Sequence, residues 1–444
     1  MGAIADTTCS TFSMKTPFLL LAGAFIFPNL GVAQTADGAG YQERVKEVRE
    51  VPGFVALWDF VKREQNGTHR FTAHVAAGDS HNYALDAGNY VRDFWGEGRA
   101  ATYADFPLLD RGPFGQAIQL RKETDTTFRP LLFVPRERLN DSAIDLKGVG
   151  KSVTLVVWAI RESGNHALAG IWHEGTDLKQ DTTSNIQKVE RGQRQYGLFA
   201  GLNKEGSACA HVSENGAGSF AYKYAMHKTN TLEISQKFPA DSPAEVLDKS
   251  WECFAMTFDN ERDKLAGWLN GTASVRWQDN VKKSLPPVYN AWLQGELHRT
   301  GASHPARDEA YPHDQFYNPP EGTPVSVQVL SETAEERIEL QEFKYTRIKV
   351  TLSKDAAGKF VVKERDLSEI SLNPWWFPYD MYSPAEATTG GPFTIGRVIH
   401  SSKSVGFTGW IGGVAVFDRA LTEAEMKRLS DLGRQAPIAL PKSR

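Results

Sequence analysis

Short apolar runs recur along the chain and are separated by clusters of Gly, Asn and Asp. The runs are rich in Val, Ile, Phe and Trp, and several alternate between apolar and polar positions, which is typical of strands in a sheet. We therefore expect a mostly-β protein. The predicted strands are Phe54–Phe60, Gln116–Arg121, Ser152–Ile160, Ala167–Trp172, Gln195–Leu202, Ala208–Val212, Trp251–Phe258, Lys264–Leu269, Phe393–Arg397 and Gly409–Phe417.

Two short motifs predict a turn and a helix. Asn270-Gly271 follows one of the predicted strands, and this dipeptide favours a type I′ hairpin because both central residues need a positive φ. Near the C-terminus, Thr422 precedes Glu425 by three residues, which is the spacing of a capping box at the start of a helix. This is the only helix that the sequence indicates clearly.

Two stretches interrupt the rhythm of strands, and we expect both to be insertions into one domain. They cover about residues 61–113 and 279–391, and the second is rich in Pro and aromatic residues at both ends. Its middle predicts a long inserted β-hairpin. The hairpin would use Ser326–Leu330 and Glu339–Leu352, a turn at Asp355–Gly358, and a returning strand at Lys359–Arg365.

The N-terminus has the pattern of a secretory signal peptide over residues 1–33. Lys15 precedes an apolar run that ends in small residues suited to cleavage, and Met14 is an alternative natural start. Residues 34–50 are polar, so we expect a flexible lead-in. The mature chain is therefore predicted to be secreted, periplasmic or extracellular.

The composition narrows the class of partner. Hydrophobic residues make up 41% and charged residues 23% of 444 residues, which is ordinary for a globular protein. The formal net charge of -4 provides no basic field for nucleic acid or an anionic membrane, and no later apolar run is long enough to span a bilayer. Cys209 and Cys253 permit one disulfide or two buried free thiols, and the oligomeric state stays open.

Two segments carry a resemblance to a known family. The first is Trp251–Asp259 with the strand Lys264–Leu269 and the Asn270-Gly271 turn, and the second runs from Thr394 to Thr422 with the sequence Asp-Arg-Ala-Leu near its end. Together they resemble the central hairpin and the closing strand of laminin-G-like and concanavalin-A-like lectin or glucanase jelly rolls. Gly412-Gly413 departs from the family, which often has Asp-Glu there, and this weakens one polar site.

The resemblance implies an all-β fold made of two antiparallel sheets packed as a jelly-roll sandwich, with long inserted loops and a short C-terminal helix. The domain would cover residues 51–432, and 433–444 would be a C-terminal tail. The family's members include lectins and glucanases, but a fold does not determine a function.

No compact catalytic motif stands in the chain. Glucanases of this fold carry Glu-x-Asp-x-x-Glu on one strand, and the nearest fragment here is Glu123-Thr-Asp125, with Phe128 in place of the second Glu. This disfavours a retaining hydrolase of that type, although carboxylates from different strands can still meet.

A polysaccharide lyase on the same scaffold would need a Tyr or His base and a polar group that neutralises a uronate carboxylate. Such residues sit on alternate positions of strands and leave no compact motif, so candidates are chosen by residue type. The candidate catalytic residues are Asn165, His166, Arg194, Tyr196 and His211. A hydrogen-bonded structural role is the alternative for each of them.

Residues that suit saccharide binding lie in the loop-like stretches. Arg92, Trp95 and Arg99 belong to the polar-aromatic segment RDFWGEGR, whose charges alternatively pair with one another. Trp375 and Trp376 suit a stacking platform or, alternatively, a cap on the core. The remaining candidates are His173, His298 and Arg299.

The sequence fixes no cofactor or metal. Asp259, Asn260 and Asp263 carry oxygen ligands that suit Ca²⁺, and an ordinary Asx-rich turn explains them equally well. The histidines at 298, 304 and 313 have no spacing typical of a zinc site.

We therefore predict an exported protein that binds extracellular polysaccharide through a loop-built groove. The alternatives are a polysaccharide-degrading enzyme, a lyase acting by β-elimination before a glycoside hydrolase, and a structural cell-surface protein. The long insertions favour an enzyme, whereas the missing carboxylate motif disfavours one.

Overall fold

The computed structural model describes residues 33–164, 166–174, 193–202, 204–216, 228–311, 316–386, 389–400 and 406–439. All of the expected signal peptide except Ala33 lies outside these residues. Within them, no helix is both long and apolar enough to cross a membrane.

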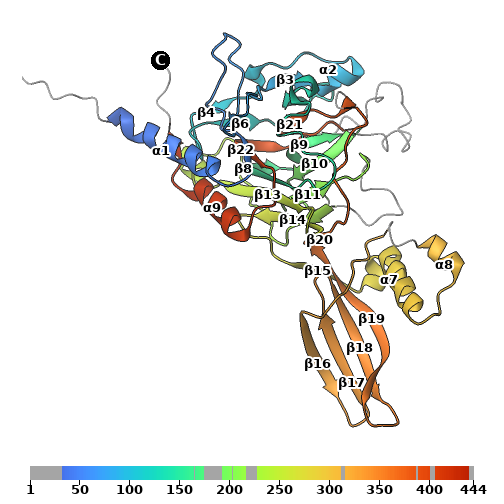
Figure 1. Cartoon of the computed structure of the whole chain (residues 1–444). Coiled ribbons are helices and arrows are strands. Elements are labelled where there is room, and N and C mark those ends of the chain that lie inside the picture. The colour runs from blue at the N-terminus through green and yellow to red at the C-terminus, as the bar shows by residue number, and fades with distance from the viewer. Residues whose placement is uncertain are drawn as a thin grey trace, which may run out of the picture.

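Two antiparallel sheets form the body of the molecule (Figure 1). The first has nine strands in the order β2-β1-β22-β8-β13-β14-β20, with β6 beside β22 and β4 beside β6. All ten predicted strands are present in this sheet or the second, so the expected sandwich is confirmed. The bounds in the first sheet are β1 (Phe54–Trp58), β2 (His74–Val75), β4 (Leu108–Leu109), β6 (Ala117–Leu120), β8 (Val153–Ser163), β13 (Glu252–Asp259), β14 (Lys264–Leu269), β20 (Trp375–Trp376) and β22 (Thr408–Phe417).

The second sheet has seven strands in the order β12-β11-β10-β9-β21-β7-β3. The core lies between the two sheets, where Leu155, Leu168, Ile171 and Phe254 are fully buried. The bounds are β3 (Asp86–Asn89), β7 (Pro130–Val134), β9 (Ala167–His173), β10 (Gln193–Phe199), β11 (Cys209–Val212), β12 (Lys228–Asn230) and β21 (Phe393–Ile395).

A helix near the C-terminus, α9 (Glu423–Arg434), covers the outer face of the nine-stranded sheet. Thr422 and Glu425 form the predicted capping box. The indole N–H of Trp158 on β8 donates to the carbonyl of Leu429 at 2.9 Å, which fixes the helix on the sheet. Beyond α9, β23 (Ile438–Ala439) pairs with β5 (Arg111–Gly112), so part of the expected tail lies on the domain.

The expected flexible lead-in at 34–50 is wrong. Helix α1 (Ala33–Arg49) occupies almost all of it and lies on the same outer face as α9 (Figure 1). Tyr41, Val45 and Val48 are buried there with residues of α9, because their spacing places them on one side of a helix.

The segment expected as insertion 61–113 contributes to both sheets. It supplies β2 and β4 to the first and β3 to the second. It also contains α2 (Tyr90–Trp95), a 3-10 turn η1 (Tyr103–Asp105), and β5. Two further short helices lie elsewhere in the domain, α3 (Arg136–Leu139) and α5 (Ala244–Leu247).

The second expected insertion projects from the edge of the sandwich near β14 and β20 (Figure 1). Its sheet has five strands in the order β15-β19-β18-β17-β16, and helices lie beside it. The bounds are β15 (Arg276–Asp279), α6 (Val281–Ser284), α7 (Pro286–Arg299), α8 (Pro305–Ala310), β16 (Ser326–Glu332), β17 (Glu336–Glu342), β18 (Thr346–Lys354) and β19 (Phe360–Asn373).

The inserted hairpin is therefore larger than expected. The predicted turn at Asp355–Gly358 is confirmed, since it joins β18 to β19. The predicted strand Glu339–Leu352 is two strands, because the backbone N–H of Phe343 bonds the carbonyl of Thr346 at 2.8 Å and closes a turn.

The structure also shows the geometry of the Asn-Gly turn and the state of the two cysteines. Asn270 and Gly271 have φ of 54° and 80°, as a type I′ turn requires. Cys209 and Cys253 are both buried free thiols, and they belong to different sheets.

Candidate functional site

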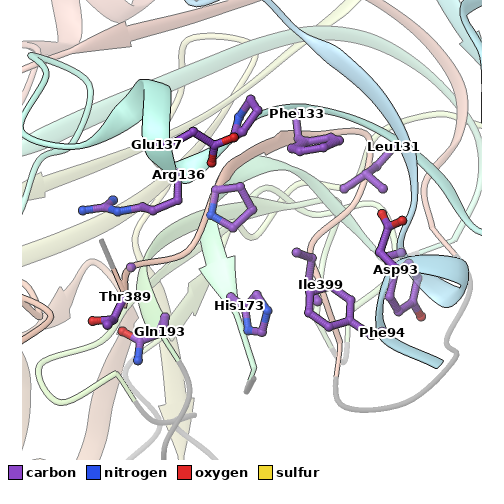
Figure 2. A pocket seen from close by; sticks show the side chains of 14 residues that line it. Asp93, Phe94, Leu131, Phe133, Arg136, Glu137, His173, Gln193, Thr389 and Ile399 are labelled. Atoms are coloured by element: carbon purple, nitrogen blue, oxygen red, sulfur yellow. The ribbon is translucent and has the colours of Figure 1, made fainter. Parts of the chain in front are cut away.

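A pocket of about 700 Å³ opens on the outer face of the seven-stranded sheet (Figure 2). Leu131 and Phe133 of β7 line it, because Leu132 and Val134 point the other way into the core. Helix α2 brings Asp93 and Phe94 to one side. The pocket therefore has an apolar floor and a wall built from the first inserted segment.

The topology explains why distant residues meet here. Neighbouring strands are antiparallel, so β7 and β9 end where β21 and β10 begin. Residues at or next to these four strand ends supply further polar side chains and backbone to the lining of the pocket. They are Pro135, Arg136, Glu137, His173, Gln193, Thr389, Gly390 and Pro392.

The aromatic side chains are held in fixed positions. A β-carbon at Gly88 would lie 2.7 Å from a ring carbon of Phe133, so the ring rests directly on the glycine backbone. Phe94 meets the ring of His173 edge to face, with centroids 5.1 Å apart. Such rings offer an apolar surface of the kind that the C–H face of a sugar can contact.

Arg136 is the one guanidinium of the pocket wall among the described residues, and its charge is matched. Its two terminal nitrogens donate to the two oxygens of Asp145 at 2.8 and 2.7 Å, and both side chains are buried. Burial alone would raise the pKa of Asp145, but hydrogen bonds from Arg136 and Lys147 outweigh it and lower that pKa. Gly390 lies against the guanidinium, where a β-carbon would be 2.5 Å from Cζ.

His173 is only 4% exposed. Burial, followed by the charge of Arg194, lowers the pKa of its imidazole to about 4, so the ring is neutral at neutral pH. The neighbouring Gln193 accepts a hydrogen bond from the hydroxyl of Tyr382 at 3.2 Å. This part of the pocket therefore presents uncharged hydrogen-bonding groups.

Two exposed carboxylates, Asp93 and Glu137, complete the polar lining. Figure 2 shows Asp93 on α2 and Glu137 on α3, on different sides of the cavity. Asp93 lies in the segment RDFWGEGR that the sequence singles out, although it is not among the binding residues chosen from it, and Glu137 belongs to no candidate set. Carboxylates accept hydrogen bonds from hydroxyl groups, so both suit a hydroxyl-rich ligand.

Most of the candidate catalytic residues do not line this pocket. Tyr196 lies fully buried in the core, and its hydroxyl donates to the carbonyl of Ile144 at 2.9 Å. His211 is also fully buried and packs against Trp172, with ring centroids 4.1 Å apart. The burial of both side chains favours the hydrogen-bonded structural alternative, and their catalytic role stays a prediction.

Arg194, His166 and Asn165 complete the catalytic set. Arg194 is buried, and its guanidinium forms an ion pair with Glu174 at 3.7 Å, which itself contacts His400 at 3.1 Å. His166 is half-buried, and burial lowers its pKa to about 4, but it does not line the pocket. Asn165 lies outside the described residues.

Of the candidate binding residues, only His173 lines the pocket. Trp95 on α2 packs edge to face on Tyr90, and Arg92 beside it is exposed. Arg99 pairs with Asp105 at 2.5 Å and lies over the ring of Phe128, so its partners lie outside the segment RDFWGEGR and not within it, as the structural alternative had expected.

The other four binding candidates belong to the second insertion or its base. His298 contacts Asp308 at 2.8 Å, and Arg299 pairs with Glu296 on the same helix. Trp375 is buried and stacks on Tyr317 with centroids 3.8 Å apart. Trp376, half-buried, follows it on β20. Trp375 and Trp376 lie where the insertion joins the sandwich, and none of the four residues lines the pocket.

The possible calcium turn has protein partners. Asp259 pairs with Arg262 at 2.8 Å, and the amide of Asn260 donates to Asp380 at 3.2 Å. Across the described residues, no group of three or more His, Cys, Asp or Glu side chains is arranged to hold a metal. Glu123, from the fragment nearest to a glucanase motif, forms ion pairs with Arg397 and Arg129.

Comparisons with known proteins give a remote likeness. No protein-family model matches the chain, and no curated protein matches it. Over 85% of its length the chain is similar to domain 4 of AbnA, a GH43 extracellular arabinanase from Geobacillus stearothermophilus, in complex with arabinotriose, with 9% identity, 98% of that chain covered and a TM-score of 0.35.

Botulinum neurotoxin binding domains are also similar. The serotype G domain matches over 85% of this chain and 50% of its own, with 8% identity and a TM-score of 0.32. The serotype D domain, in complex with N-acetylneuraminic acid, matches over 87% and 52%, with 6% identity and a TM-score of 0.30. The chain thus spans about half the length of these toxin chains.

Proposed function

We propose that this chain is an exported carbohydrate-binding protein of the laminin-G-like or concanavalin-A-like class, and that the pocket on the seven-stranded sheet binds polysaccharide. One observation carries the proposal. A single cavity of about 700 Å³ combines apolar ring surface with uncharged and anionic hydrogen-bonding groups. Sugars present C–H faces and hydroxyl edges, and both kinds of group find partners there.

Two further features support the proposal from the sequence. The segment before Ala33 has the pattern of a signal peptide, which suits an extracellular or periplasmic glycan. The closing strand, the Asp-Arg-Ala-Leu turn and the capped helix resemble those of laminin-G-like jelly rolls.

The test is affinity electrophoresis of the purified chain in gels that contain neutral or uronate polysaccharides. We expect retardation on at least one polymer, and at least tenfold weaker binding after Phe133→Ala, because the substitution removes the aromatic floor of the pocket. Phe360→Ala is the matched control, since Phe360 is a half-buried Phe at the start of β19 in the insertion. Unretarded migration on every polymer would refute the proposal.

An enzyme remains the second candidate, and a specific observation now favours a glycoside hydrolase over a lyase. Asp93 and Glu137 line one pocket from different elements, and glycoside hydrolysis uses a pair of carboxylates. The lyase candidates Tyr196 and His211 are fully buried. Release of reducing ends by the wild type that is lost in Glu137→Gln would establish a hydrolase. If the wild type releases no reducing ends from any polymer that it binds, hydrolysis of those polymers is excluded.

A further inference from the structure

We infer that the edge strand β16 of the insertion pairs with β16 of a second copy of this chain, so that the protein forms a closed dimer. β16 is the last strand of the five-stranded sheet, and all seven of its residues are exposed. Figure 1 shows this sheet projecting from the sandwich, with β16 along its outer edge. The inference goes beyond carbohydrate binding and does not depend on it.

β16 differs in length from the other strands that end a sheet in the described part of the chain. Each of those strands has only two to four residues, whereas β16 has seven; they are β2, β4, β20, β3, β12, β15, and the isolated pair β5 and β23. The edge of a sheet exposes unpaired backbone N–H and C=O groups, and a short edge strand presents few of them. A long edge strand such as β16 is therefore a template on which another strand can pair.

Charged side chains protect the other long open edge of the same sheet, but they do not protect β16. β15 pairs with β19 only at residues 369–373, and the part of β19 before this pairing carries four consecutive charged residues at 363–366. Over 325–331 the chain contains no charged residue and no proline. Charge and proline are common means by which an edge strand avoids pairing with another chain, and β16 has neither along this stretch.

Valine side chains stand exposed along β16. Val325, Val327 and Val329 are 73, 51 and 41% exposed. Val327 lies opposite Gln341 of β17, which lies opposite the buried Ile348 of β18, so the apolar face of the sheet continues out to its edge. A further strand beside β16 would shield these valines from water, which is favourable.

The sequence of this edge fits a second copy of itself. Residues 325–329 read Val-Ser-Val-Gln-Val, a pattern of apolar and polar positions that is the same in both directions. Antiparallel pairing about a two-fold axis at Val327 places Val325 opposite Val329, Ser326 opposite Gln328, and Val327 opposite its own copy. Apolar residues then face apolar ones and no charge faces another. The same patch is used by both copies, so the assembly closes as a dimer.

The dimer is expected to be weak. The pairing of β16 with β17 shifts between Val329 and Ser331, so a bulge at Leu330 ends the regular part of the edge. Only residues 325–329 of each copy then pair, which is less than a standard protein–protein interface. We therefore expect a dissociation constant on the order of 1 to 10 µM.

Sedimentation velocity of the purified full chain across about 1 to 100 µM covers the expected dissociation constant. We expect the mass to rise from that of one chain towards that of two. Val327→Lys puts two like charges opposite each other at the axis, so the dissociation constant should rise by roughly tenfold or more. Val362→Lys is the matched control, because Val362 is an equally exposed valine of the same sheet on β19, and this variant should dimerise like wild type.

A mixture of two variants tests the register and controls for a misfolded sheet. Val327→Lys and Val327→Glu should each be monomeric alone, because like charges face each other at the axis. In an equimolar mixture a lysine faces a glutamate, so we expect dimers to return. A variant whose sheet had unfolded could not regain the dimer in this way.

The remaining outcomes each overturn the inference. A wild type that stays monomeric at every concentration has no such contact. A dimer that Val327→Lys leaves intact is held together elsewhere on the molecule. Masses that keep rising beyond two chains indicate open, head-to-tail pairing instead of a closed dimer. A mixture that stays monomeric contradicts the pairing of Val327 with its own copy.

Discussion

At the scale of single residues, the buried imidazole of His173 links stability to pH. Its pKa in the fold is about 4, below the ordinary value of 6.5, so the unfolded chain binds a proton more readily than the folded one. The stabilising effect is therefore present above about pH 6.5 and is lost as the pH falls towards 4. Between pH 7.5 and 4.5 the loss amounts to roughly 2 to 3 kcal/mol for this residue.

Urea unfolding of wild type and His173→Gln at these two pH values measures the effect. We expect the variant to lose less free energy of unfolding on acidification, by roughly 2 kcal/mol, because glutamine does not titrate. His69→Gln is the control, since it makes the same substitution at an exposed histidine. Equal losses in wild type and His173→Gln would contradict the linkage.

The site residues could not be selected by residue type alone. Tyr196 and Gln193 stand on the same strand, β10, yet one fills the core and the other lines the pocket. Nearly every residue of β10 is buried, so polarity along the strand does not alternate with the face. In addition, a register shift between Arg194 and Tyr196 interrupts the alternation of side chains between the two faces of the sheet.

At the scale of elements, helix α1 is fastened to the sandwich by a buried polar contact. The hydroxyl of Tyr41 donates to Asp59 at 2.6 Å, and the same carboxylate contacts His74 at 2.6 Å. Asp59 is fully buried at the end of β1 and also accepts two backbone N–H groups. Because the Asp59 carboxylate has several hydrogen-bond donors, the loss of one donor weakens the attachment of α1 but leaves the carboxylate hydrogen-bonded.

We predict that Tyr41→Phe lowers the free energy of unfolding by roughly 1.5 to 3 kcal/mol, the usual range for a hydrogen bond to a charged group. It should also speed cleavage within 33–49 in limited proteolysis. Lys46→Gln on the same helix is the control, because its ion pairs with Glu43 and Glu50 are exposed and contribute little. Equal stability and protection of the two variants would show that the contact does not hold α1.

Helices were predictable where they carried a local signal. Helix α9 was found because Thr422 and Glu425 form a capping box. Helix α7 was missed because it opens with Pro286-Pro287, which reads as a break although Pro suits the first turn of a helix. Strand β7 was missed because Pro130–Val134 is apolar on both faces and starts at a proline.

At the scale of the whole molecule, the pocket and the large insertion belong to different parts of the sandwich. The pocket is built on the seven-stranded sheet, whereas the insertion joins the nine-stranded sheet through β20. The sequence reveals the insertion, because the regular succession of predicted strands stops there. It does not reveal the sheet to which the insertion is attached. That depends on long-range pairing, here of Lys264 with Trp376 and of Leu265 with Trp375.

This separation predicts that stability and glycan binding respond independently at Trp375. The indole is 4% exposed and stacks on Tyr317, so Trp375→Ala should cost about 3 to 5 kcal/mol through the cavity it leaves. Affinity for any polysaccharide bound by wild type should stay within twofold, because Trp375 does not line the pocket. Chemical denaturation gives the first quantity, and titration calorimetry well below the melting temperature gives the second.

Phe133→Ala should show the opposite pattern, with a small loss of stability and a large loss of affinity. The two variants together therefore separate a binding residue from a stabilising one. Phe133 is only half-buried on the outer face of its sheet, so its loss should affect stability less than that of Trp375 while abolishing most of the affinity. A folded Trp375→Ala protein that no longer binds would instead place the glycan on the Trp375–Trp376 platform. The insertion, and not the seven-stranded sheet, would then be the functional part of the molecule.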